Sequence, residues 1–188
     1  MLLAWRRNVW NYPVGIANTV LFIGLFCSAA LYAQVGLQII FLLLAITGWI
    51  GWARARRRES AANLQRDEAF VASVPPVVAA GLLVGFLIAT FAVRWLLLEF
   101  TDSSVALADA ATTAASLVAQ LMLNRRWWQS WIVWIAVDIV YVWLYATTGL
   151  WITALLYAGF CVMCFFALRE WVAVKAAVQP AEREMVRV

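Results

Sequence analysis

Histidine is absent from this sequence, and charged residues make up only 13% of its 188 positions. Histidine is the commonest proton carrier and metal ligand near neutral pH, so much of the usual catalytic and metal-binding chemistry is excluded. The sequence also shows no acid pair at catalytic spacing and no nucleophile beside a base. We therefore expect a protein that is not an enzyme and that holds no metal and no cofactor.

Cysteine is nearly as scarce, because only Cys27, Cys161 and Cys164 are present and all three lie in apolar segments. Cys161 and Cys164 have the spacing of a redox motif. Two cysteines three residues apart on an apolar helix are nevertheless more often small packing residues. We expect no disulfide chemistry from them.

What the chain has in abundance is apolar sequence, at 66% of its residues, together with 12 tryptophans. A helix needs about 20 residues at 1.5 Å each to cross a bilayer. Apolar runs of about this length lie at 11–31, 35–53, 74–98, 104–123, 129–147 and 150–171. The sequence thus predicts an all-α integral membrane protein with six transmembrane helices in this chain.

The basic residues are distributed unevenly around these runs. If the chain crosses the membrane at each run, 13 of its 14 basic residues fall on one side, while the other side receives Glu99 and Asp102, with Arg94 nearby. Cytoplasmic loops are enriched in Lys and Arg, so both termini of this chain are predicted to be cytoplasmic. The net charge of +4 therefore reflects topology, and we expect no nucleic-acid partner.

The runs divide into two groups that echo each other. Arg6-Arg7 precedes YPVGIA (12–17) and LYAQVGL (31–37), while Arg125-Arg126 precedes WIVWIA (131–136) and LYATTGL (144–150), with the second copy six residues shorter inside. We predict an incomplete first repeat at 1–53, a cytoplasmic linker at 54–73, a connector helix at 74–98, a second three-helix repeat at 99–171 and a cytoplasmic tail at 172–188. Parallel repeats of this kind are a transporter architecture with the substrate between the halves.

Polar and aromatic residues recur at helical spacing within the runs. One face of 129–147 carries Trp131, Trp134, Asp138, Tyr141 and Tyr145; other stripes are Asp109, Thr112, Thr113, Ser116 and Gln120, then Gln34, Gln38, Phe41, Gly48, Trp49 and Trp52, then Asn11, Gly15 and Asn18. We expect these stripes to converge on one interior cavity. The alternative is that they only hold helices together, and that tryptophans near span ends belong to the interfacial belt.

Asp138 is the unusual member of these stripes. A charged Asp at the centre of a membrane helix costs about 2.5–3.5 kcal/mol on insertion scales, so it should face the bundle interior and have a function. Protonation, a polar neighbour or a cationic ligand would each make it tolerable. The tryptophans on the same face favour a cationic ligand, since a desolvated cation over an indole gains about 2 kcal/mol.

Several of these segments resemble the PnuC family of bacterial vitamin transporters. They are RRNVWNYPVGIAN, LYAQVGLQIIF, GWIGW, TTAASLVAQ, WIVWIAVDIVYVWLY and GLWITALLYAGF, in the family's order and over nearly the whole chain to Trp171. The best-known members carry nicotinamide riboside. The resemblance implies a seven-span, three-plus-one-plus-three fold similar to the SWEET sugar carriers, here without its first helix, and often a homotrimer. This chain departs from the family at Ser130, where Asn is common.

The resemblance also implies facilitated diffusion across the bacterial inner membrane, with a cytoplasmic riboside kinase trapping the vitamin as its phosphate. Substrate-cavity positions that carry over are Gln38, Trp49, Trp52, Thr113, Gln120, Trp131, Trp134 and Asp138, to which the helical stripe adds Tyr141. We predict stacking of the nicotinamide ring on the tryptophans and hydrogen bonds from the glutamines. Alternatives are a thiamine carrier or another vitamin or nucleoside carrier of the same fold, a proton-coupled carrier, and a membrane scaffold without a substrate.

Overall fold

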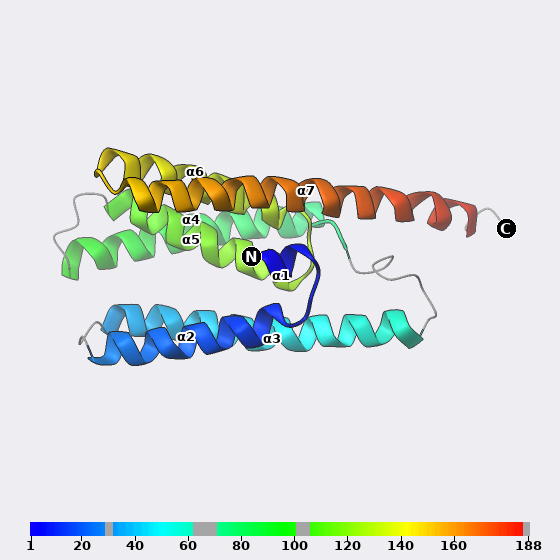
Figure 1. Cartoon of the computed structure of the whole chain (residues 1–188), viewed down its shortest axis with the longest axis horizontal. Helices are drawn as coiled ribbons and strands as arrows, with labels where there is room; N and C mark the ends of the chain where they lie inside the picture. The colour runs from blue at the N-terminus through cyan, green and yellow to red at the C-terminus, as the bar shows by residue number, and fades with distance from the viewer. Residues whose placement is uncertain (29–31, 62–70, 101–105, 186–188) are drawn as a thin grey trace.

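The computed structural model describes residues 1–28, 32–61, 71–100 and 106–185 (Figure 1). Their helices are α1 (Leu2–Trp5), α2 (Asn11–Ser28), α3 (Tyr32–Ala61), α4 (Pro76–Phe100), α5 (Ala106–Asn124), α6 (Ser130–Thr147) and α7 (Trp151–Met185). Asp102, residues 62–70 of the predicted linker and the last three residues of the predicted tail lie outside this set. Six of these helices, α2 to α7, are long and apolar enough to cross a membrane, so the predicted number of spans is confirmed.

Two helices extend well past the predicted spans. α3 continues through the arginine-rich segment to Ala61, and α7 continues past Trp171 to Met185. Arg, Ala and Glu all favour helix, and neither extension contains a glycine, so the helices do not end where their apolar runs end. The segment predicted as a linker is therefore helical over its first eight residues.

The helices form two groups on either side of the short helix α1. α2 and α3 pack as a pair, α4 to α7 pack as a second group, and α5 contacts α3 (Figure 1). α1 lies between the two groups and packs against α7. The turn from α6 to α7 is tight because Gly149 adopts a φ of 78°, which glycine reaches without steric cost.

The three helices of the first half of the chain, α1–α3, correspond in order to the three helices of the second half, α5–α7. The last two pairs of corresponding helices begin the same number of residues apart. α6 and α7 each begin 119 residues after their counterparts α2 and α3, at Ser130 after Asn11 and at Trp151 after Tyr32. Residues 32–37 of LYAQVGL therefore lie at the start of α3, whereas LYATTGL begins inside α6. That part of the sequence echo is not at equivalent positions, and the predicted six-residue shortening is wrong.

The arginine pairs, in contrast, are structurally equivalent. Arg7 and Arg126 both adopt left-handed backbone conformations, with φ of 53° and 62°, which non-glycine residues rarely do. The amide of Arg7 donates to the carbonyl of Ala4 (3.0 Å), and the amide of Arg126 donates to the carbonyl of Leu123 (2.9 Å). α1 thus ends in the same way as the membrane helix α5.

An aromatic cluster joins the halves. Tyr12 meets Trp52 edge to face at 5.1 Å between ring centroids, and Trp131 meets Trp171 edge to face at 5.5 Å. Trp52 and Trp171 also lie 6.2 Å apart. All four side chains are buried, so they form the centre of the packed core.

Candidate functional site

A polar cavity of about 300 Å³ lies where α1, α2, α3, α5 and α6 meet. Its lining residues are Met1, Ala4, Asn11, Tyr12, Gly15, Asn18, Thr19, Gln38, Phe41, Ala45, Gln120, Leu123 and Trp134. Small-molecule sites are typically concave and contain a few convergent polar groups among apolar ones. This cavity has that character, with amide, hydroxyl and aromatic groups converging from both halves of the chain.

Three of the predicted site residues line this cavity: Gln38 from α3, Gln120 from α5 and Trp134 from α6. The predicted stripe of the first span, Asn11, Gly15 and Asn18, lines the cavity from α2. Through these residues, the predicted stripes of four membrane helices converge on one cavity.

All three predicted residues have polar atoms without a protein partner within the described residues. These atoms are the side-chain amide of Gln38, Oε1 of Gln120 and the indole nitrogen of Trp134. The Trp134 nitrogen is fully buried and does not open onto the cavity, so the two glutamines are the residues that can pair with a ligand.

Asn124 organises one wall of the cavity, although sequence reasoning did not select it. Its Oδ1 accepts hydrogen bonds from the Tyr12 hydroxyl (3.1 Å) and from Gln120 Nε2 (3.0 Å). Its Nδ2 donates to the backbone carbonyl of Leu44 (2.7 Å). One amide therefore fixes α2, α3 and α5 relative to one another. It lies directly before Arg125 and just outside the predicted span 104–123.

Trp52 and Trp131 are fully buried but do not line the cavity. Both belong to the aromatic cluster, and the Trp52 indole donates to the carbonyl of Leu123 (3.1 Å). Trp52 lies directly behind the wall, because it packs on Tyr12 and donates to Leu123, and both of these residues line the cavity. Its contact with the cavity is thus indirect.

Asp138 points toward α7, and it does not line the cavity. It is 2% exposed, and its Oδ2 accepts a hydrogen bond from the Cys164 thiol (3.6 Å). It lies one helical turn beyond Trp134 on α6. Cys164 is fully buried, in keeping with a packing role.

The remaining predicted site residues lie elsewhere. Tyr141 contacts Tyr145 and Tyr157 in a tyrosine cluster between α6 and α7, with ring centroids 4.8–5.8 Å apart. Thr113 is half-buried on α5, and Trp49 is 42% exposed on α3. None of the three is part of the cavity wall, so their binding roles stay predictions.

A larger cavity of about 720 Å³ lies between α4, α5 and α6. It is lined by Phe86, Arg94, Leu98, Ala106, Leu107, Ala108, Ala111, Thr112, Ala115, Ala136, Val137, Val140 and Trp143. Nearly all of these side chains are apolar, and several are exposed on the membrane-facing surface. Specific ligands are held by several convergent polar groups, so the smaller polar cavity is the better candidate for a specific ligand.

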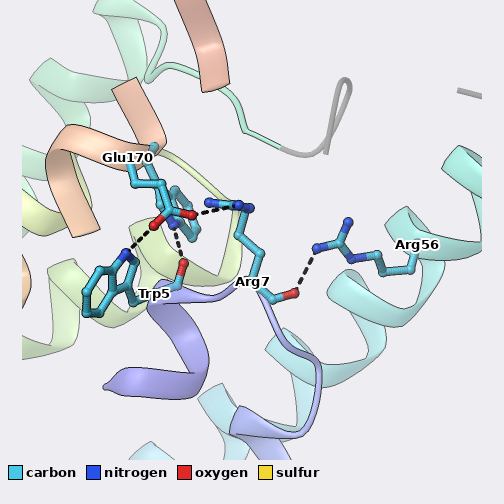
Figure 2. A network of polar contacts seen from close by, with 5 residues as sticks. Trp5, Arg7, Arg56 and Glu170 are labelled. Atoms are coloured by element: carbon cyan, nitrogen blue, oxygen red, sulfur yellow. Dashed lines mark hydrogen bonds and ion pairs between the residues drawn. The ribbon is translucent and has the colours of Figure 1, made fainter. Parts of the chain in front are cut away.

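A polar network beside the small cavity joins α1 and the residues after it to α3 and α7 (Figure 2). Glu170 on α7 pairs with Arg7 (2.8 Å) and accepts a hydrogen bond from the Trp5 indole (2.5 Å). Arg56 on α3 donates to the Arg7 carbonyl (2.8 Å), and Trp171 donates to the Trp5 carbonyl (3.0 Å). This network ties α1 to both halves, which positions the α1 residues that line the cavity.

The described part of the chain contains no group of three His, Cys, Asp or Glu side chains placed to hold a metal ion. The lining side chains are all neutral, and they can form hydrogen bonds and stack on aromatic rings. Those are the means of binding a small polar ring compound.

Comparisons with known proteins agree with this description. The sequence model of a family described as nicotinamide mononucleotide transporter matches residues 1–173. The nicotinamide riboside transporter PnuC of Escherichia coli (strain K12) is 25% identical over 191 residues, covering 90% of this chain and 79% of that protein. The riboflavin/roseoflavin transporter RibM of Streptomyces davaonensis is 24% identical over 172 residues, covering 91% and 78%.

Among solved structures, the crystal structure of the vitamin B3 transporter PnuC matches this one with a TM-score of 0.64 at 16% sequence identity. The match covers 93% of this chain and 76% of that chain. A similarity at this level of identity shows a shared all-helical membrane fold.

Proposed function

Because the chain belongs to the nicotinamide mononucleotide transporter family, whose members are membrane transporters rather than enzymes, we propose that it carries nicotinamide riboside across the bacterial inner membrane by facilitated diffusion. The observation that carries the proposal is the convergence of Gln38, Gln120 and Trp134 on one polar cavity. Membership of this family directly supports transport of a vitamin-like substrate.

The cavity favours the riboside over its phosphate ester. No Arg, Lys, Asp or Glu side chain is among the lining residues. A phosphate group carries a charge of about −1.5 to −2 near neutral pH and is normally bound by cationic side chains or helix N-termini. Ribose hydroxyls and a carboxamide need only neutral donors and acceptors, which Asn11, Asn18, Gln38 and Gln120 can supply.

The roles of the predicted residues follow from their positions. Trp134, with Phe41 and Tyr12, provides aromatic surface for the cationic nicotinamide ring, an interaction of about 2 kcal/mol when desolvated. Asp138, one turn away and buried, balances the ring charge at longer range. Trp52 supports the wall from behind. Direct contacts by Trp49, Thr113 or Tyr141 would require a different arrangement of the halves, as alternating access provides.

The wider organisation belongs to the same proposal. The first repeat (1–53) rocks against the second repeat (99–171) around the cavity, the connector (74–98) joins them, and both termini of this chain lie in the cytoplasm. A riboside kinase in the cytoplasm traps the vitamin as its phosphate, and three copies assemble as a trimer. The matching ends of α1 and α5 and the constant separation of the halves support this division.

Uptake of radiolabelled nicotinamide riboside into proteoliposomes tests the assignment. We expect Trp134→Ala, Gln38→Ala and Gln120→Ala to lower uptake by roughly 10- to 100-fold at subsaturating substrate, because each removes a ligand contact of about 1–3 kcal/mol. Trp143→Ala is the matched control, since Trp143 lies on the same helix as Trp134 but is 61% exposed. Equal uptake by all four variants would refute the site.

Riboflavin is a second candidate substrate. The relative from Streptomyces davaonensis is named a riboflavin/roseoflavin transporter, and its sequence identity to this chain is nearly the same as that of the nicotinamide riboside transporter. Thiamine, another flat cation, remains the alternative from sequence. Excess unlabelled riboflavin, thiamine or nicotinamide riboside should be added separately to the uptake assay. We expect only nicotinamide riboside to compete, because a single ring plus a sugar suits a cavity of about 300 Å³ better than a three-ring system. No thermal stabilisation by any vitamin would favour a scaffold.

A further inference from the structure

Asn124 constrains which end of the Gln120 amide can face a ligand. Both groups that approach Asn124 Oδ1 are donors, the Tyr12 hydroxyl and Gln120 Nε2. The Asn124 amide cannot be reversed, because its Nδ2 already donates to the Leu44 carbonyl. The carbonyl of Asn124 is thereby held toward Gln120, and Gln120 must turn its NH₂ group toward Asn124.

The consequence is that Gln120 offers the cavity its carbonyl oxygen. Within the described residues no group donates to Gln120 Oε1, and Gln120 lines the cavity. A free glutamine can rotate its terminal amide and present either a donor or an acceptor to a ligand. Here the contact with Asn124 removes that choice, so this part of the cavity wall is an acceptor.

The acceptor determines which ring substituent the cavity can pair. The indole N–H of Trp134 is fully buried and does not open onto the cavity, so the group fixed by the protein is Gln120 Oε1. A carboxamide has an NH₂ group that can donate a hydrogen bond to this oxygen. A carboxylate has only acceptors and would leave Gln120 Oε1 facing a negative oxygen.

We propose that Asn124 is a positioning residue that makes the transporter select a carboxamide over a carboxylate, by holding Gln120 as an acceptor. This inference rests on the proposed function, because it concerns the ring substituent of the same riboside. The loss of a matched hydrogen bond in a buried site costs a ligand roughly 10- to 100-fold in affinity. Sites built to pair a polar group discriminate in this way against analogues that cannot make the pair.

Calorimetric titration of the purified full chain tests it, with nicotinamide riboside and nicotinic acid riboside as the two ligands. The quantity to compare is the ratio of their Kd values. We expect the unchanged protein to prefer the amide roughly 10- to 100-fold. Asn124→Ala should bring the ratio close to one, because the Gln120 amide is then free to rotate. Gln120→Leu should do the same by removing the acceptor.

Tyr12→Phe is the matched control. It removes one hydrogen bond to the same Asn124 oxygen but leaves the bond from Gln120 in place, so stability should fall while the ratio stays as in the unchanged protein. If Asn124→Ala fails to fold, Asn124→Ser replaces it with the same expectation, because the shorter side chain cannot reach Gln120.

Two results would overturn the inference. If Asn124→Ala or Asn124→Ser weakens both ligands by the same factor, Asn124 has only a structural role. If Gln120→Leu keeps the preference for the amide, the acceptor does not set it. In both cases the unchanged protein still binds nicotinamide riboside and the proposed function stands. Failure of the unchanged protein to bind either riboside would instead remove the proposed function, and this inference with it.

Discussion

Gly48 is the residue that allows α3 to approach the Asn124 amide and the Tyr12 ring so closely. A Cβ atom placed at Gly48 would overlap both Asn124 Oδ1 and the Tyr12 ring. The neighbouring Gly51 has much more room, since its nearest non-local atom would be the Asn124 carbonyl oxygen at 3.8 Å from an added Cβ. The same helix therefore contains one glycine required by packing and one that is not.

We predict that Gly48→Ala lowers the thermal unfolding midpoint of the detergent-solubilised protein and weakens riboside binding. The expected loss is about 1–3 kcal/mol, because overpacking displaces the Asn124 side chain from its three hydrogen bonds. Gly51→Ala is the control, and it should be neutral or stabilising by up to about 1 kcal/mol, since alanine favours helix. Equal midpoints for the two variants would show that α3 adjusts freely around Asn124.

Single site residues could be predicted from the sequence mainly where a polar residue interrupts an apolar run. Gln38 and Gln120 were found in this way, and Trp134 was found through its helical spacing. The same spacing also selected Trp52 and Trp131, which pack against other indoles, because the interior face of a helix includes both cavity wall and core. Asn124 escaped notice because its role depends on two partners distant in sequence, Tyr12 and Leu44, in addition to Gln120 one helical turn away.

At the scale of helices, the two halves hold each other through reciprocal hydrogen bonds. Trp52 at the end of the α3 span donates to Leu123 near the end of α5, and Trp171, 119 residues later on α7, donates to Trp5 at the end of α1. Each half thus provides a tryptophan whose indole N–H donates to a backbone carbonyl at a helix end of the other half. The two bonds are nearly equal in length, at 3.1 and 3.0 Å.

We predict that Trp52→Phe and Trp171→Phe destabilise the protein by similar amounts, about 1–3 kcal/mol each. Each change removes one indole N–H from a carbonyl and leaves a small void in a buried cluster. Midpoints of thermal unfolding in one detergent provide the comparison, with Trp143→Phe as the exposed control on α6. A large loss for one variant and none for the other would show that only one of the two bonds contributes to stability.

Helices were the most predictable level of structure. Hydropathy alone located the six spans, because a bilayer requires long apolar segments whose backbone groups are satisfied within the helix. Helix ends were less predictable: α3 and α7 extend beyond their apolar runs, where residue propensity rather than hydropathy decides the end. The Arg7 and Arg126 turns could be matched from sequence, but their left-handed conformations could not.

For the whole molecule, the separation between the cavity and Asp138 bears on the energetics of transport. Asp138 does not line the cavity, and its hydrogen-bonding partner is the Cys164 thiol on α7. In a carrier that exchanges a proton for its cationic substrate, the proton and the substrate compete for the same acid. The acid would therefore have to lie in the binding site. Their separation favours a carrier that moves the cationic riboside without a compensating proton, so that each cycle transfers one positive charge.

We therefore predict that the membrane potential drives uptake into proteoliposomes. One elementary charge is worth about 2.3 kcal/mol per 100 mV, which corresponds to roughly 50-fold accumulation when the inside is negative. A potassium gradient with valinomycin sets the potential, and the internal concentration of labelled riboside is measured at equal internal and external pH. Asp138→Asn should keep this voltage dependence, because the acid only balances charge at a distance. Accumulation that follows a pH gradient, ignores the potential and disappears in Asp138→Asn would establish proton exchange at Asp138 instead.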